Sequence, residues 1–238
     1  MRVKIVFSYD GSKFSGFQRQ NNLKTVQKEI EKALKSITNE SIEIKGAGRT
    51  DAKVHANGQV AHFDLKNPID NIKNILNSIL NPDICIKKLN IVSEDFHARH
   101  SAKKKEYIYK INVGPYQSSL NDYYYQTNYK LDVSLMKEAA KHMIGTHDFR
   151  SFVSGEREDY VTTIYSISFT KAFGKLEIRF VGTGFYRYMI RNLMGALIEV
   201  GKCKIKSSTI QEMLLSKENS IQLPTAPPEG LYLNKVWY

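Results

Sequence analysis

Apolar and polar residues alternate along the first positions of the chain. Every second residue from position 3 to position 9 is apolar or aromatic, namely Val3, Ile5, Phe7 and Tyr9. This is the period of a strand with one buried face. Apolar residues then recur at helical spacing from Val26 to Ile37, behind Thr25 as a candidate N-cap. The first element is therefore predicted to be a strand and the second a helix.

Further changes in the spacing of the apolar residues predict the remaining elements of the first half. Short strands are predicted over 41–45 and 59–65, a helix over 69–79 that ends at Asn81-Pro82, and a strand over 84–92. The order is β-α-β-β-α-β.

The second half repeats this order. Strands are predicted over 106–113, 161–169, 176–181 and 231–237, and helices over 132–145, 187–200 and 208–215. The first of these helices is expected to begin at Asp132, and Gly145 and Gly201 are candidate helix stops. The pattern predicts an α+β fold of two split-βαβ units, RRM-like or ferredoxin-like, with mixed or antiparallel sheets. We expect domains at 1–98 and 99–238, packed with a cleft between them.

Composition narrows the class of partner. Lys and Arg number 35 against 24 Asp and Glu, a formal charge of +11, and 42% of residues are hydrophobic. A chain this apolar can bury a core, and its charge favours an anionic partner such as nucleic acid. Two distant cysteines and no membrane-length apolar run or signal sequence favour the cytoplasm.

A glycine-flanked loop over 46–58 gathers Arg49, Asp51, Lys53 and His55. It is longer than a hairpin connection needs. One interpretation is an Asx-type turn with solvated basic residues. The other is an active-site loop in which Asp51 is the nucleophile or base and Arg49 lies near a phosphate.

Two more segments combine positive charge with aromatic rings. Residues 96–107 hold Arg99, Lys103, Lys104 and Lys105 beside Tyr107. This combination suits an unstacked nucleotide, although a solvated charge run would look the same. Over 182–192, Arg191 lies in a strongly apolar stretch, where a buried arginine needs a carboxylate partner.

Six segments, in order, resemble the TruA family of tRNA pseudouridine synthases. They are SYDGSKFSGFQRQ with TVQ (8–20, 25–27), GRTDAKVHA (48–56), FHARHSAKKKEYIY (96–109), GTHDFRSF (145–152), GTGFYRYMIRNLMGALIEVG (182–201) and TAPPEGLYL (225–233). The resemblance implies a homodimer without metal or organic cofactor. It also implies isomerisation of uridine to pseudouridine at positions 38, 39 and 40 of the tRNA anticodon stem-loop.

The resemblance also implies roles for single residues. Asp51 matches the catalytic aspartate, and Arg191 the arginine that pairs with it. Tyr107 matches the ring that stacks on uracil, and Arg49 an arginine that helps the base leave the stack. The expected RNA contacts are Arg19, Lys53, His55, Arg99, Lys103, Lys104 and Lys105.

Three positions depart from the family pattern. Lys53 stands where glycine is usual, Phe17 where tryptophan is common and His100 where phenylalanine is usual. Lys53 demands a backbone conformation that a non-glycine residue can adopt, or adds a phosphate contact. The rival hypothesis is an RNA-binding protein that keeps the fold without catalysis.

Overall fold

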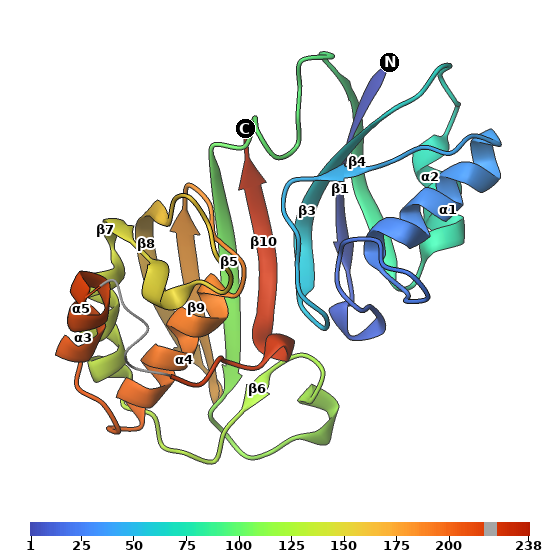
Figure 1. Cartoon of the computed structure of the whole chain (residues 1–238). Helices are drawn as coiled ribbons and strands as arrows, with labels where there is room; N and C mark the ends of the chain where they lie inside the picture. The colour runs from blue at the N-terminus through green and yellow to red at the C-terminus, as the bar shows by residue number, and fades with distance from the viewer. Residues whose placement is uncertain (217–222) are drawn as a thin grey trace. The chain divides into compact units, whose positions relative to one another are not determined.

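The computed structural model describes residues 1–216 and 223–238 and has an α+β fold (Figure 1). It divides into two compact units, one of residues 1–103 with 232–238 and the other of residues 104–231. The boundary lies after Lys103 rather than after Ala98, and residues 232–238 return to the first unit.

The first unit is a sheet with two helices on one face (Figure 1). Its elements are β1 (Arg2–Tyr9), the 3-10 turn η1 (Gly11–Lys13), α1 (Val26–Thr38), β2 (Lys45–Gly46), β3 (His55–Asp64), α2 (Ile72–Leu80), β4 (Ile84–Val92) and β10 (Leu231–Trp237). Strand β1 lies between β4 and β3 and is antiparallel to both, and β2 pairs with β3. The predicted β-α-β-β-α-β order is confirmed.

Alternate residues of β1 form the core of this unit, as the period of two predicts. Ile5 and Phe7 are fully buried, together with Ile30 and Leu34 of α1. Burying each of these side chains stabilises the fold by about 1.5–3 kcal/mol. Strand β1 is therefore a rigid support for whatever its ends carry.

The last strand corrects one expectation. The sequence pattern assigns 231–237 to the second half, whereas β10 pairs in parallel with β3, placing Tyr232 opposite His55 and Leu233 opposite Ala56. A side-chain bond from Asn57 Nδ2 to Asn234 Oδ1, 2.9 Å long, extends this pairing. Periodicity records which face of a strand is buried and carries no information about its partner strand.

The second unit contains a four-strand antiparallel path, β5-β9-β8-β7, with β6 added beside β5. Its elements are β5 (Lys104–Asn112), η2 (Ser118–Leu120), β6 (Tyr125–Gln126), α3 (Val133–Met143), β7 (Gly145–Asp148), η3 (Arg150–Phe152), β8 (Val161–Ala172), β9 (Lys175–Gly182), α4 (Met189–Gly201), α5 (Ser208–Ser216) and η4 (Pro228–Gly230). Helix α3 packs against α4 and α5. Asp132 is the N-cap of α3, because its carboxylate accepts from the amides of Ser134 and Leu135.

Two local expectations fail for identifiable reasons. The strand predicted over 41–45 is reduced to the two residues of β2, because α1 side chains bind the backbone of Ile44: its amide donates to Glu31 Oε1 and its carbonyl accepts from Gln27 Nε2. Thr25 stands at the N-cap of α1 without a side-chain capping bond. The first amides of α1 donate instead to the carbonyls of Gly16 and Phe17.

In the two described ranges, none of the helices has the length and apolar character that crossing a membrane requires.

Candidate active-site loop and its surroundings

The segment between β2 and β3 carries Arg49 and Asp51. Asp51 is half-buried and Arg49 is exposed. A main-chain bond of 3.2 Å from the Val54 amide to the Asp51 carbonyl closes the turn. Thr50, directly before Asp51, is buried, and its Oγ1 lies 2.8 Å from the Tyr9 hydroxyl.

The segment after β1 holds this loop from one side. The Phe17 amide donates to the Thr50 carbonyl at 3.1 Å, and the Lys53 amide to the Phe14 carbonyl at 3.3 Å. Gly16 adopts φ +95°, and a Cβ there would lie 3.0 Å from the Thr50 carbonyl oxygen. Glycine is required for this conformation and this approach. The SYDGSKFSGF motif is therefore the support of the GRTD motif.

His55 supports the end of the loop. Its Nδ1 accepts the Gly11 amide at 3.0 Å, so this nitrogen carries no proton, although Asp10 Oδ1 lies 3.4 Å away. The ring stacks on Tyr232 with centroids 4.5 Å apart and planes 13° apart. At 2% exposure, His55 has almost no surface for the expected RNA contact and instead joins the loop to β10.

Lys53 adopts the left-handed backbone conformation, with φ +64°. Glycine reaches this region without steric cost, whereas a residue with a Cβ adopts it at about 1–2 kcal/mol. The lysine therefore occupies a glycine-type conformation, and its side chain is exposed.

In the second unit, Tyr107 lies in β5 opposite Phe180 of β9. It is 8% exposed, and its ring meets Phe185 edge to face, with centroids 5.4 Å apart. Packing on Phe185 fixes the plane of the Tyr107 ring.

Arg191 lies on α4 and is held by the segment that follows α5. Its Nε donates to the Ala226 carbonyl at 2.8 Å, and the Ala226 amide donates back to the Arg191 carbonyl at 3.0 Å. Its guanidinium lies 4.9 Å from the centroid of the Tyr188 ring. At Gly195, one turn further on, a Cβ would lie only 1.8 Å from the Pro224 carbonyl oxygen. Segment 224–226 therefore needs this glycine in order to reach Arg191.

The other expected RNA contacts differ in their surroundings. Arg99 and Lys103 are exposed, while Lys104 and Lys105 are half-buried at the start of β5. Arg19 is exposed and lies 3.1 Å from Glu31 in an ion pair. The Arg19 side chain is 57% exposed, so a phosphate could reach it, whereas its partner Glu31 is 10% exposed.

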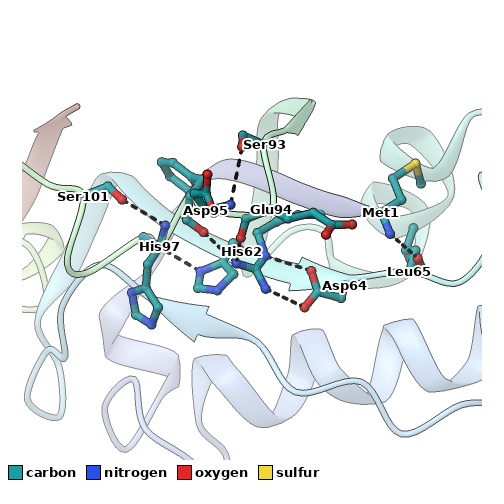
Figure 2. Close-up of polar contacts among 12 residues, drawn as sticks. Met1, His62, Asp64, Leu65, Ser93, Glu94, Asp95, His97 and Ser101 are labelled. Carbon is teal, nitrogen blue, oxygen red and sulfur yellow. Dashed lines mark hydrogen bonds and ion pairs between the residues drawn. The ribbon is translucent and has the colours of Figure 1, made fainter.

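A polar cluster that the sequence analysis missed holds the FHARH segment against the first sheet (Figure 2). Arg2 binds both carboxylate oxygens of Asp64 at 2.9 Å, and its Nη1 donates to the carbonyls of Glu94 and Phe96. The paired guanidinium lowers the pKa of Asp64.

His62 completes the cluster from β3. Its Nδ1 accepts the Ala98 amide at 3.1 Å, and its ring lies 4.7 Å from that of His97 (Figure 2). Burial, with the nearby charges of His97 and Arg2, lowers the pKa of His62 to about 4. The neutral ring of His62 positions the backbone of Ala98, which directly precedes Arg99. Alternation along β3 would have identified His62 only as a residue on the face opposite the helices.

Among the residues in the two described ranges, no group of three or more His, Cys, Asp or Glu side chains could hold a metal ion.

Comparison with known proteins decides the family. A family model described as tRNA pseudouridine synthase matches residues 5–101 and 139–238. The tRNA pseudouridine synthase A of Bacillus subtilis is 42% identical over 245 residues, covering 100% of this chain and 99% of the relative. That of Thermosipho melanesiensis is 42% identical over 244 residues, with the same coverage. The chain belongs to the tRNA pseudouridine synthase family.

Membership confirms the resemblance to the TruA group and makes the chain an enzyme, an isomerase that acts on uridine in tRNA. A search of solved structures also finds the archaeal box H/ACA sRNP Nop10-Cbf5 complex, at 15% identity and a TM-score of 0.37, covering 83% of this chain and 43% of that one. For this tRNA pseudouridine synthase, the GRTD loop is the candidate catalytic segment.

Proposed function

We propose that this enzyme converts uridine to pseudouridine at positions 38, 39 and 40 of the tRNA anticodon stem-loop, with Asp51 as its catalytic carboxylate. The supporting observation is the construction of the loop. Main-chain and side-chain bonds fix Thr50 directly before Asp51 and Lys53 two residues after it, while Asp51 itself stays half-buried. A fixed backbone with an accessible carboxylate is what a catalytic group requires.

The reaction can use a carboxylate at two steps, once before the uracil ring turns and once after it. The bond between N1 of uracil and C1′ of ribose breaks, the ring turns, and C5 bonds to C1′ in its place. The hydrogen on C5 leaves as a proton, and N1 gains one, so the product is an isomer of the substrate. Asp51 can attack the sugar or the base, or take a ribose proton, and can accept the C5 proton later.

Three further residues complete the proposed site. By the family resemblance, Arg191 is the proposed ion-pair partner of the Asp51 carboxylate. Its Nε bond to Ala226 fixes the plane of the guanidinium and thereby the direction of its Nη hydrogens. Tyr107, held by Phe185, stacks on the extruded uracil, and Arg49, which is exposed, helps the base leave the helix. Stacking and phosphate contacts offset the few kcal/mol that extrusion costs.

The deciding experiment uses an anticodon stem-loop with tritium at uracil C5. Isomerisation releases tritium into water, whereas binding alone does not. Asp51→Asn should release none while binding the RNA as the wild type does. Asp70→Asn, which makes the same change at an exposed position, is the matched control and should keep full activity. Tritium release by Asp51→Asn at the wild-type rate would refute the assignment.

We also propose that the enzyme works as a homodimer in the cytoplasm and binds tRNA phosphates through Arg19, Lys53, Arg99, Lys103, Lys104 and Lys105. Light scattering on the purified enzyme tests the first point, with a mass twice that of the 27.3 kDa chain expected. A mass of one chain would contradict it.

A further inference from the structure

We propose that Tyr9 is a positioning residue of the reaction, because its hydroxyl bonds to Thr50 and so fixes the peptide that carries Asp51. The proposal rests on the proposed role of Asp51. Tyr9 lies 42 positions before Asp51 in the sequence, and no expectation from the sequence gives it a part in catalysis.

The bond between the two hydroxyls is short and dry. Tyr9 OH and Thr50 Oγ1 are 2.8 Å apart, and their residues are 5% and 9% exposed. Burial raises the pKa of Tyr9 to about 12, so the phenol is neutral at neutral pH and keeps its proton for hydrogen bonding. A buried pair of this kind has no water to replace a lost partner.

Tyr9 is itself rigidly held. It ends β1, which pairs with β3 on one side and β4 on the other, and its backbone lies opposite Ala56 and Ile84. Its ring packs against Phe7 and Phe14 with centroids 6.0 and 6.3 Å away. The phenol oxygen is therefore a fixed point relative to the sheet.

Two hydrogen bonds hold main-chain carbonyls of the same loop. The Phe17 amide holds the Thr50 carbonyl at 3.1 Å, and Gln59, with no exposed surface, donates from Nε2 to the Gly48 carbonyl at 2.9 Å. These bonds fix the path of the loop, and the Tyr9 bond adds a constraint on the Thr50 side chain. Without the phenol hydroxyl, the buried Thr50 hydroxyl loses this partner, and the peptide before Asp51 can shift to find another. A displacement well below 1 Å at a catalytic group is enough to slow a reaction.

A catalytic positioning role and a merely structural role make different predictions. Loss of stability alone would lower the amount of folded enzyme and leave the rate per folded molecule unchanged. Misplacement of Asp51 would slow the chemical step at saturating enzyme and leave RNA affinity unchanged, because Tyr9 and Thr50 are buried.

The test measures single-turnover tritium release and RNA affinity for Tyr9→Phe, Thr50→Val, their double variant and Thr50→Ser, each shown to be folded at the assay temperature. Tyr9→Phe and Thr50→Val should each slow release about 10-fold, and the double variant should be no slower than either. Thr50→Ser, which keeps the hydroxyl, should stay within about 3-fold of wild type, and every RNA dissociation constant within about 2-fold.

Tyr238→Phe is the matched control, since it removes a tyrosine hydroxyl bond of 2.7 Å to the Ala98 carbonyl elsewhere in the same unit. Its release rate should equal that of the wild type. The proposal is overturned if Tyr9→Phe releases tritium at the wild-type rate, if the two single effects multiply, or if Tyr238→Phe is equally slow. Asp51→Asn in the same assay separates the two ideas: activity there removes the proposed function itself, whereas inactivity there with unimpaired Tyr9→Phe removes only the role of Tyr9.

Discussion

Acidification should destabilise the first unit through His62, the buried histidine that accepts the Ala98 amide. In the unfolded chain a histidine titrates near its ordinary value of 6.5, whereas the pKa of native His62 is lowered to about 4. The native state therefore gains stability from the neutral ring above pH 6.5 and loses it as the pH falls toward 4. At pH 5 the linkage amounts to about 2 kcal/mol, and solvent screening reduces this to about 1–2 kcal/mol.

The assay is urea unfolding of the wild type and of His62→Gln at about pH 7.5 and about pH 5. Glutamine keeps an acceptor for the Ala98 amide but does not titrate. Between the two pH values the wild type should lose about 1–2 kcal/mol more of its free energy of unfolding than the variant does. His142→Gln, on α3 of the second unit, should follow the wild type. Equal losses for the wild type and His62→Gln would refute the reasoning.

Three further outcomes are expected. Gly195→Ala would place a Cβ 1.8 Å from the Pro224 carbonyl oxygen, so it should lower the free energy of unfolding by about 1–3 kcal/mol and slow tritium release. Gly184→Ala is the control and should do neither, because a Cβ there would have nothing within 4 Å. Equal thermal midpoints for the two variants would contradict this prediction. Lys53→Gly should raise the free energy of unfolding by about 0.5–1 kcal/mol, because glycine adopts φ +64° freely, and a lower midpoint would count against it. Replacing 103–105 with alanine should reduce the salt slope of tRNA affinity by about 2–3, and an unchanged slope would show that these lysines do not contact phosphates.

The sequence predicts most of the fold because burial imposes a period on each element. The alternation that identifies β1 and the helical spacing that identifies α1 are direct records of which side chains are buried. Strand β2, with only two residues, does not follow this rule. Side chains of α1 make the hydrogen bonds to the backbone of Ile44 that a neighbouring strand would otherwise make. Long-range pairing, such as that of β10 with β3, has no periodic signature either.

The candidate site, like the fold, is only partly predictable from the sequence. Asp51 and Arg191 stand in motifs that resemble a known family, and their positions in a loop and on a helix follow from the sequence. The roles of Tyr9 and His62 do not follow from the sequence. Alternation predicts only which face of the sheet each side chain lies on, and it does not predict the group that the side chain contacts. Only the structure reveals that one hydroxyl meets Thr50 and one ring meets the Ala98 amide.

The membership of β10 in the first unit constrains how this enzyme matures during synthesis. The ribosome makes residues 1–103 first, but the strand that covers β3 comes only after all of 104–231. Until then the start of β3, at His55 and Ala56, has an open edge, and His55, next to the candidate catalytic loop, lacks the Tyr232 ring on which it stacks. A nascent or prematurely terminated chain thus exposes a sheet edge that invites aggregation and holds its GRTD segment without full support. The segment that carries Asp51 therefore gains its support from Tyr232 only after the second unit has been synthesised.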